Sequence, residues 1–380
     1  MESREFTGQD GFRDFEDYFH SLGIDRVFLV TGKDSYSESG ASAAIDRLLD
    51  GKHVTRFNEF TANPDVLEVS AGAELLRRHP ADVVLAIGGG SVLDMGKCVS
   101  LLSQHSQAPA AIVSGKAPIE NPAIPVVAIP TTAGSGSEAT RFATVYIDKT
   151  KHSLEHDSIR PVVTVVDPAF TLSLSPYQTA VTGIDALSQA IESYWSIRSS
   201  EQSRGLAARA IELAMTSLEK AVSRPDRVSR LNMIIAANLA GKAINITKTT
   251  ACHALSYYLT SRFLVPHGHA VALTLSRMLE YNSGVTADDV VDERGVSFVR
   301  DNTLSLAKLL GAGDIPGGVN TIETLMTNLG LRNPIPGLDI DDNHIRKMVH
   351  DAMNSNRMSN NPRSFTAESL ASLLNSAVRL

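Results

Sequence analysis

The first half of the chain alternates short apolar runs with segments of helical period. The run at residues 83–87 is continuous and ends in three glycines, and it predicts a buried strand. Similar strands are expected at residues 26–30, 54–57, 126–129 and 162–166, with helical patterns at 43–49, 66–78 and 93–102 between them. Strands that alternate with helices predict an α/β domain, a Rossmann-like parallel sheet with helices on both faces.

The second half has a different period. After about residue 176 the sequence holds long amphipathic patterns and no convincing strand. The change of period near residues 168–176 predicts a boundary between two domains, 1–174 and 175–380, of which the second is all-α. A chain of 380 residues is long enough for two domains of ordinary size.

Charge and cysteine content exclude several classes of protein. The chain carries 35 basic and 42 acidic residues, a formal net charge of −7, without a run of Lys or Arg. This balance disfavours nucleic acid and anionic membrane surfaces as partners. The apolar runs are too short to span a bilayer, and the first residues show no secretory signal. Two cysteines make no disulfide framework, so we expect a cytoplasmic protein.

A glycine-rich turn at residues 88–91 follows the strand at 83–87 and opens a helical segment. Glycines let the backbone approach a phosphate closely, and a helix N-terminus supplies free N–H groups and the positive end of a dipole. The spacing is not the GxGxxG of the usual dinucleotide fold, and a purely structural tight turn is the alternative. Asp94 and Lys97 follow on the new helix, where a solvated face is the simplest interpretation.

A second glycine-rich turn at residues 130–138 also follows an expected strand. Its two threonines, two glycines and small residues suit contacts to adenosine or phosphate, although a plain strand-to-helix loop has the same composition. Ligands of open α/β sheets bind at the carboxyl ends of the strands. Two such turns therefore favour a cofactor site.

Four residues of the second half are candidate metal ligands. Asp185 and Gln189 are four apart and would share one face of a helix, while His253 and His267 lie in later segments. One carboxylate, one amide oxygen and two imidazoles suit a divalent ion with open positions. Spacing alone is weak evidence, because a histidine within a helix is more often a packed core residue.

Taken together, these motifs resemble those of the iron-containing, group III alcohol dehydrogenase family. The similarity covers nearly the whole chain and rests on the segments 88–97, 130–138, 167–168, 183–191 and 241–267. It implies a fold shared with dehydroquinate synthase, in which a nicotinamide-binding α/β domain and a helical domain enclose the site. It also implies interconversion of alcohols and aldehydes with a divalent metal, commonly Fe²⁺ or Zn²⁺. We expect a homodimer.

By this resemblance the metal ligands are Asp185, Gln189, His253 and His267. The family usually has His where Gln189 stands and often has a second His where this chain has Tyr257. An amide oxygen is a weaker, harder ligand than imidazole, so occupancy should be partial, and Mn²⁺ is a third candidate. His253, His267 and Tyr257 are the expected catalytic residues, and the Tyr257 hydroxyl could pass a proton or simply pack.

The resemblance also supplies dinucleotide contacts, at Gly88, Gly89, Gly90, Ser91, Asp94, Thr131, Thr132 and Lys151. Members that prefer NAD often carry an acidic residue after the first strand, where this chain has Gly32. Lys33 and Ser35 could hold a 2′-phosphate there. We therefore expect NADP(H), with NAD(H) as the alternative that the neighbouring Asp34 keeps open.

Segments 189–195, 241–245 and 248–253 resemble the phosphonoacetaldehyde reductase branch of this family. A phosphonate is close to dianionic, so its pocket needs cations. Lys248, Lys242 and Arg141 are the candidates, with Arg262 and His269 less supported, and a solvated role is an even alternative for each lysine. On one continuous helix Lys242 would share a stripe with His253, about 16 Å away along the axis.

Three other functions remain open from the sequence. A general metal-dependent alcohol dehydrogenase would act on neutral short-chain substrates. A non-redox lyase or cyclase of the dehydroquinate synthase type would share the fold and bind nicotinamide transiently. A cofactor-binding protein without catalysis is suggested by the altered ligand set.

Overall fold

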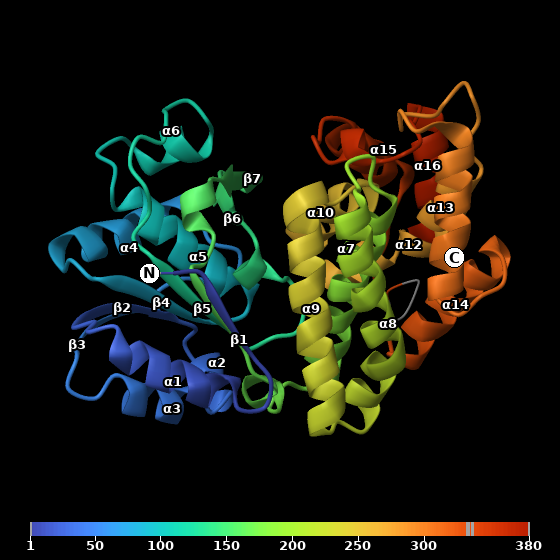
Figure 1. Ribbon diagram of the computed structural model, residues 1–380. Helices are drawn as coiled ribbons and strands as arrows, with labels where there is room; N and C mark the ends of the chain where they lie inside the picture. Colours follow the sequence, from blue (N-terminus) through green and yellow to red (C-terminus); the bar gives the residue numbers. More distant parts are fainter. Residues whose placement is uncertain (1, 332–334, 336–337, 379–380) are drawn as a thin grey trace. The chain divides into compact units, whose positions relative to one another are not determined.

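The computed structural model describes residues 2–331, 335 and 338–378 (Figure 1). The chain forms two compact units, Met1–Leu174 and Ser175–Leu380, which are described separately below. The first contains all the strands of the described chain, and the second is built from helices.

In the described part of the first unit, six strands form one parallel sheet, in the spatial order β1-β8-β5-β4-β2-β3. They are β1 (Arg4–Thr7), β2 (Arg26–Thr31), β3 (His53–Phe57), β4 (Val83–Gly88), β5 (Val126–Pro130) and β8 (Val163–Val166). A separate antiparallel hairpin consists of β6 (Phe142–Ile147) and β7 (Thr150–Glu155). The parallel sheet confirms the predicted fold class.

Helices cover both faces of this sheet (Figure 1). Side chains alternate between the faces along each strand. Val84 and Ala86 pack against α4 and α5, whereas Val83 and Leu85 pack against α1 and α3. The helices are α1 (Gly11–Ser21), α2 (Ser35–Glu38), α3 (Ala41–Leu48), α4 (Val66–Arg78), α5 (Gly90–Leu102) and α6 (Pro109–Val113). Both faces are buried, which explains the continuous apolar runs of the central strands.

The second unit is centred on α7 (Pro176–Trp195), which contacts α8, α9, α11 and α13. Ser175 caps α7 reciprocally with Gln178, and Pro176 occupies its first turn. The remaining helices are α8 (Glu201–Ser223), α9 (Arg227–Thr247), α10 (Ala251–Phe263), α11 (His267–Ala272), α12 (Leu275–Ser283), α13 (Gly295–Leu309), α14 (Ile315–Asn328), α15 (Asp342–Met353) and α16 (Ala367–Val378). No strand occurs among the described residues of this unit, as predicted.

Two sequence interpretations are wrong. Lys97 is not on a solvated face, because its side chain is fully buried. Lys242 and His253 do not share one helix: α9 ends at Thr247, and Lys248 has φ 61° and ψ 176°, far from helical values. The chain therefore turns between Lys242 and His253, and the distance expected along a single axis does not apply.

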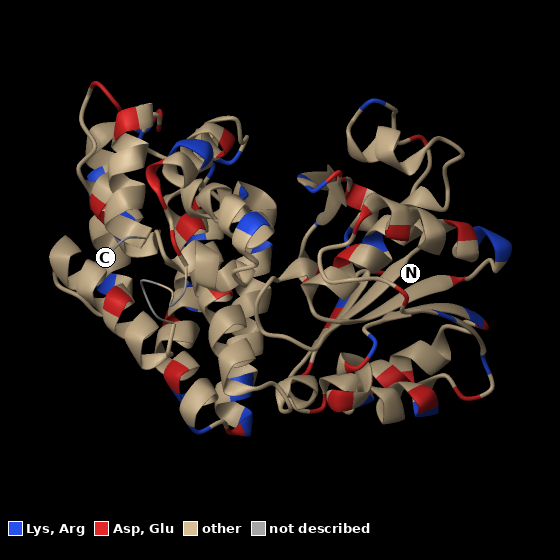
Figure 2. Ribbon diagram, turned by 180° about the vertical axis from the view of Figure 1, so that it is seen from behind, with Lys and Arg blue, Asp and Glu red and all other residues tan. Residues whose placement is uncertain are grey.

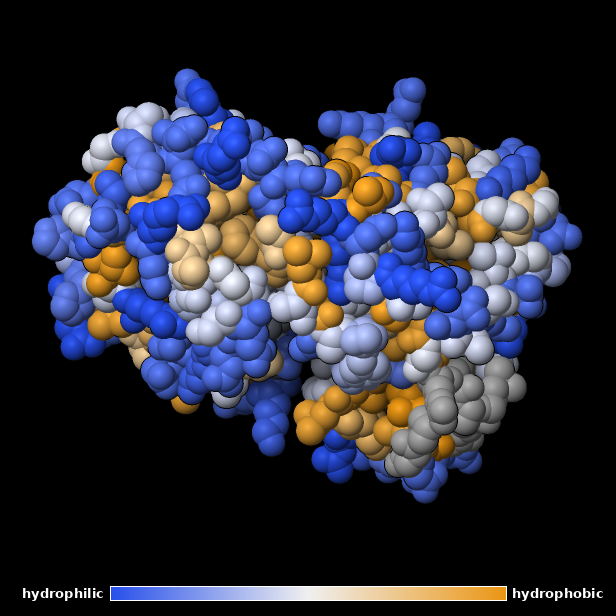
Figure 3. Space-filling model, turned by 90° about the horizontal axis from the view of Figure 1, so that it is seen from below, coloured by the Kyte–Doolittle hydropathy of each residue, from blue (hydrophilic) through white to orange (hydrophobic). Residues whose placement is uncertain are grey.

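The surface carries both signs of charge. Figure 2 shows acidic and basic residues interspersed on the helices of both units. Figure 3 shows a largely hydrophilic face with separate apolar areas. Large exposed apolar side chains are scattered along the sequence, Leu67, Val228 and Leu264 among them. In the described chain, no helix is both long enough and apolar enough to cross a membrane.

Lys97 connects α5 to the end of the second glycine-rich turn and to the residues just after it. Its ammonium donates to the Ser137 carbonyl, to the hydroxyls of Ser137 and Thr140 at 2.8 and 3.0 Å, and to the Phe142 carbonyl at 3.1 Å. Burial lowers the pKa of Lys97 to about 8, against the opposing effect of Asp94 and Glu138. The network fixes the turn that contains Ser137.

Replacement of Lys97 by methionine should therefore destabilise the protein. The new side chain has a similar length but leaves buried acceptors without their donor, so we expect the free energy of unfolding to fall by about 3 kcal/mol. Denaturant titration measures this change. Lys116→Met is the matched control, because Lys116 is exposed on the same unit. Equal stability of the two variants would show that the Lys97 network contributes nothing.

Candidate functional site

Asp185, His253 and His267 converge in the second unit. Asp185 lies in the middle of α7, His253 in the first turn of α10, and His267 is the first residue of α11. Each offers one ligand atom, and these atoms all lie within 4.8 Å of one another. Asp185 and His253 are buried, and His267 is partly buried. Three separate helices thus bring together three of the four predicted metal ligands.

Glu192 orients His253 and was missed by the sequence analysis. Its Oε2 accepts a hydrogen bond from His253 Nδ1. Its Oε1 accepts from the backbone N–H groups of Cys252 and His253 at 2.7 and 3.3 Å and from the Thr250 hydroxyl at 2.8 Å. Since a carboxylate only accepts, Nδ1 carries a proton, and Nε2 faces Asp185 Oδ1, 3.6 Å away.

A signal for Glu192 was present in the sequence. Asp185, Gln189 and Glu192 are spaced by four and three residues along one helix, so they share one face. A fully buried carboxylate on that face needs partners, and the start of α10 supplies them.

The electrostatics of the cluster favour a positive charge. Burial lowers the pKa of His253, but the carboxylates of Glu192 and Asp185 outweigh it and raise the pKa to about 9. Burial likewise acts to raise the pKa of Glu192, yet His253 and the Thr250 hydrogen bonds bring it below its usual value. Two buried carboxylates around the imidazoles thus create a location where a cation is stabilised.

The other predicted residues of this cluster lie as follows. Gln189 is buried one turn after Asp185 on α7, and its Nε2 donates to Asp185 Oδ2 at 3.2 Å. Tyr257 lies one turn after His253 on α10 and is partly buried. His269 is buried on α11, and Arg262 lies in the last turn of α10. The donor set of one carboxylate and two imidazoles, with an adjacent amide, fits a divalent metal ion.

Gly268 allows α11 to approach α7 next to two of these candidate ligands. A Cβ atom at Gly268 would lie 2.0 Å from the Val181 carbonyl oxygen and 2.8 Å from the Asp185 Cβ atom. Both are far shorter than any van der Waals contact. The absence of a side chain at Gly268 therefore permits His267 and Asp185 to lie as close together as they do.

The candidate dinucleotide site lies in the first unit, at the carboxyl end of the sheet. Thr31 of β2 aligns with Ile87 of β4, and Gly88 of β4 aligns with Pro130 of β5, so the three following turns are neighbours. From β2 the chain continues outward to β3, whereas β4 lies on the other side of β2. The strand order thus reverses between β2 and β4, and open α/β sheets bind ligands at such a switch point.

The two glycine-rich turns pack directly against each other. The Thr131 N–H donates to the Gly88 carbonyl at 2.9 Å. A Cβ atom at Gly89 would lie 3.3 Å from Thr132 Cγ2, and one at Gly90 would lie 2.7 Å from Ser135 Oγ. Gly89 caps α5 with an extended backbone, which leaves the first N–H groups of this 13-residue helix at the turn. This geometry suits a phosphate group.

Several predicted dinucleotide contacts also have structural partners. Asp94 accepts hydrogen bonds from the Ser137 hydroxyl at 2.5 Å and the Thr144 N–H at 2.9 Å. The Ser91 hydroxyl accepts from the Asn63 N–H at 3.3 Å. Lys151 lies on β7, opposite Tyr146. After β2, Lys33 pairs with Glu59 at 3.1 Å, and Gly32 lies beside the Ser35 hydroxyl.

Both halves of the chain match models of one protein family. Residues 3–168 match the family described as iron-containing alcohol dehydrogenase. Residues 179–378 match the C-terminal part of the Fe-containing alcohol dehydrogenase family. The chain belongs to the iron-containing alcohol dehydrogenase family. It is an NAD(P)-dependent alcohol dehydrogenase or aldehyde reductase, which excludes the non-redox lyase.

Two relatives match this chain over most of their own length. Phosphonoacetaldehyde reductase of Streptomyces viridochromogenes is 39% identical over 358 residues, covering 92% of this chain and 89% of the relative. The probable alcohol dehydrogenase EutG of Escherichia coli is 31% identical, covering 92% and 87%. Among solved structures, sulfoacetaldehyde reductase from Bifidobacterium kashiwanohense in complex with NAD⁺ is 30% identical with a TM-score of 0.88, covering 99% and 96%.

The three candidate substrate cations of this alcohol dehydrogenase lie in different surroundings. Lys248 caps the end of α9, and its backbone has a positive φ that non-glycine residues rarely adopt. Lys242 lies within α9 itself and is partly buried. Arg141 belongs to the first unit and pairs with Glu155 and Asp157, both at 3.2 Å. Of the two lysines, Lys248 lies on the turn between α9 and α10, two residues before Thr250, whose hydroxyl donates to Glu192.

Proposed function

We propose that this enzyme reduces phosphonoacetaldehyde to 2-hydroxyethylphosphonate, with NADPH as hydride donor and a divalent metal at Asp185, Gln189, His253 and His267. The observation that carries the proposal is a strained cationic residue, Lys248, on the turn beside the metal-type cluster. A dianionic substrate needs a cation or several convergent donors close to the residues that would hold the metal ion.

The turn that holds Lys248 is fixed on both sides. The Thr247 hydroxyl donates to the Ser193 hydroxyl at 2.9 Å, and the Thr249 carbonyl accepts from the Asn360 amide at 3.0 Å. Trp195 Nε1 donates to the Thr250 hydroxyl at 2.9 Å, and Thr250 in turn donates to Glu192. These contacts hold a backbone conformation that costs about 1–3 kcal/mol in a non-glycine residue. Such strain is often found at functional sites.

Two relatives support an anionic substrate. The names of the Streptomyces viridochromogenes reductase and the Bifidobacterium kashiwanohense reductase specify phosphonoacetaldehyde and sulfoacetaldehyde. Both compounds are two-carbon aldehydes with a tetrahedral anionic group on the second carbon. A shared preference for this class of substrate would explain a lysine on the turn beside the metal-type cluster.

The proposed mechanism assigns a role to each residue of the cluster. The bound groups supply Lewis-acid polarisation of the aldehyde oxygen and hydride donation from a reduced nicotinamide. Glu192 accepts the Nδ1 proton of His253, which would leave Nε2 to bind the ion. Tyr257, one turn further along α10, is the proposed proton donor to the product oxygen, with His267 as the alternative. The ion would be Fe²⁺ or Zn²⁺, with Mn²⁺ as a third candidate.

The dinucleotide is proposed to bind at the carboxyl ends of β2, β4 and β5. Gly88, Gly89, Gly90 and Ser91 would contact the pyrophosphate, together with Asp94, Thr131, Thr132 and Lys151 around them. Gly32 leaves no carboxylate to repel a 2′-phosphate, which supports NADP(H) over NAD(H). A homodimer and a cytoplasmic location remain part of the proposal.

The substrate assignment is tested by comparing aldehydes of equal size. We expect phosphonoacetaldehyde to exceed a neutral aldehyde in kcat/KM by about 100-fold, because two charge-assisted hydrogen bonds supply that difference. Lys248→Gly should lower this ratio by about tenfold and at the same time stabilise the protein by about 1 kcal/mol, because it relieves the backbone strain. NADPH oxidation and thermal unfolding measure the two effects.

Lys242→Gln is the matched control on α9, the helix that ends just before Lys248, and it should leave the ratio within about twofold. Equal turnover of neutral and anionic aldehydes by the unaltered enzyme would instead identify a general alcohol dehydrogenase. If Lys248→Gly leaves the ratio of the two kcat/KM values unchanged, another cation must anchor the anionic group. Absence of turnover with either class, despite NADPH binding, would refute both substrate assignments.

A further inference from the structure

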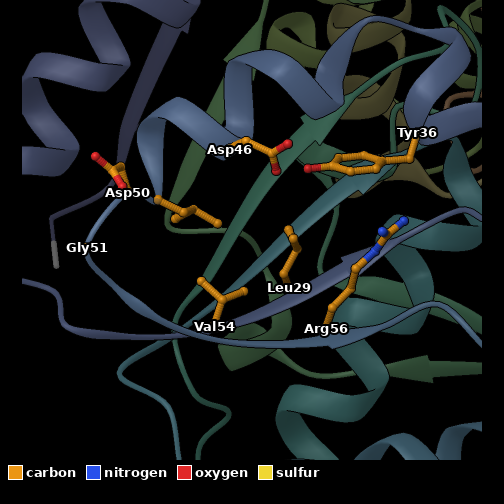
Figure 4. A pocket seen from close by; sticks show the side chains of 8 residues that line it. Leu29, Tyr36, Asp46, Asp50, Gly51, Val54 and Arg56 are labelled. Atoms are coloured by element: carbon orange, nitrogen blue, oxygen red, sulfur yellow. The ribbon is translucent and has the colours of Figure 1, made fainter.

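Arg56, near the end of β3, lies beside the turn that follows β2. Its Nε donates to the Thr31 hydroxyl at 3.0 Å, and one terminal nitrogen donates to the Gly32 carbonyl at 3.4 Å. Its guanidinium carbon lies 4.6 Å from the centroid of the Tyr36 ring. Figure 4 shows the Arg56 side chain running beneath that ring. The guanidinium is therefore oriented before any ligand binds, which reduces the entropy cost of binding an anion.

Arg56 and its neighbour Lys33 are both cationic but differ in the groups that they contact. Lys33 forms an ion pair with Glu59, whereas the hydrogen-bond partners of Arg56 within the described chain are a hydroxyl and a carbonyl. Arg56 is also exposed to solvent. A guanidinium with neutral partners and solvent access keeps its charge and several N–H donors for a ligand.

Tyr36 acts as a platform for Arg56. The ring is buried, with 4% of the residue exposed, and its hydroxyl has no hydrogen-bond partner among the described residues. In Figure 4 this hydroxyl points toward Asp46, across a cavity of about 340 Å³ between α3 and strands β2 and β3. The ring, rather than the hydroxyl, is thus the part of Tyr36 that contacts Arg56.

We propose that Arg56 is the residue that selects the 2′-phosphate of NADP(H). This inference rests on the proposed function, which places the dinucleotide at this edge of the sheet. The ribose of a dinucleotide lies beside the first strand of such a site, and an arginine there accommodates the 2′-phosphate. Gly32 removes the competing carboxylate, and Arg56 supplies a planar donor pair at the same turn. Arg56 is then the specificity-determining residue, and Tyr36 is its positioning residue.

The test measures binding rather than turnover. The 380-residue chain is titrated with NADPH, NADH, 2′,5′-ADP and 5′-AMP by calorimetry. Arg56→Gln should weaken binding of NADPH and 2′,5′-ADP by about 10- to 100-fold and that of NADH and 5′-AMP by less than about threefold. Arg56→Lys should lie between Arg56→Gln and the unaltered protein, because it keeps the charge but loses the planar pair.

Three further variants separate this role from general effects of charge or packing. Arg26→Gln removes the same charge at the opposite end of β2, where Arg26 pairs with Asp82, and it should leave all four affinities unchanged. Tyr36→Phe removes only the unpartnered hydroxyl and should also be neutral. Tyr36→Leu removes the platform and should lower NADPH affinity without lowering NADH affinity.

The outcomes distinguish a failure of the role assigned to Arg56 from a failure of the proposed function. If the unaltered protein prefers NADPH and Arg56→Gln keeps that preference, the role of Arg56 is refuted while the cofactor assignment stands. If the unaltered protein binds NADH as tightly as NADPH, the NADP(H) assignment fails, and this inference fails with it. Phosphonoacetaldehyde reduction with NADH would then still uphold the substrate assignment.

Discussion

Gly268→Ala should empty the candidate metal site of a protein that still folds. The added methyl group would lie 2.0 Å from the Val181 carbonyl oxygen and 2.8 Å from the Asp185 Cβ atom, so α11 must move away from α7. His267 begins α11, and its ligand atom now lies within 4.8 Å of those of Asp185 and His253. A shift of about 1 Å or more would remove one of the four proposed protein ligands from reach of a shared ion.

We expect the metal content of purified Gly268→Ala to fall at least about tenfold and its aldehyde reduction to fall about 100-fold or more. Elemental analysis and NADPH oxidation measure these two quantities, and circular dichroism reports the fold. Gly205→Ala is the matched control, because Gly205 is also helical and a Cβ atom there meets nothing within 4 Å. Full metal content in Gly268→Ala would show that the approach of α11 to α7 does not position His267.

Glu192→Gln should weaken metal binding without removing any ligand. Oε1 of Glu192 faces the backbone N–H groups of Cys252 and His253, which can only donate, so the glutamine must keep its oxygen there. Its NH₂ group then faces His253 Nδ1. Since that group donates, the imidazole proton moves to Nε2, the atom that faces Asp185. The lone pair that would bind an ion is lost.

The expected effect is a decrease in affinity for Zn²⁺ or Mn²⁺ of about 100-fold, at the upper end of what partners behind metal ligands contribute. A competition titration with a chelating dye measures it, and ¹⁵N shifts of the imidazole report the tautomer. Glu212→Gln serves as the control, because Glu212 is exposed on α8 and pairs with Arg209. An unchanged affinity together with an unchanged tautomer would refute the assigned role of Glu192.

The local sequence determined the fold class. The apolar runs that end in Gly88 and Pro130 predicted strands buried on both faces, because each is continuous, short and bounded by turn residues. The amphipathic period after residue 176 likewise predicted helices. These patterns depend on residues that are neighbours in the sequence, so they can be recognised without knowledge of distant contacts. The short edge strand β1 and the β6–β7 hairpin lacked such a pattern and were not predicted.

The residues of the candidate site required the tertiary structure. Asp185 and Gln189 could be placed on one face from their spacing, but the approach of His253 and His267 depends on how α10 and α11 pack on α7. Glu192 and Gly268 owe their roles to that packing alone: one is a buried carboxylate with an imidazole partner, and the other is a missing Cβ atom. Lys97 was assigned to solvent because its acceptors lie 40 or more residues further along the chain. Sequence periodicity reports which side of an element faces inward, whereas the partner found there is decided by the packing of distant segments.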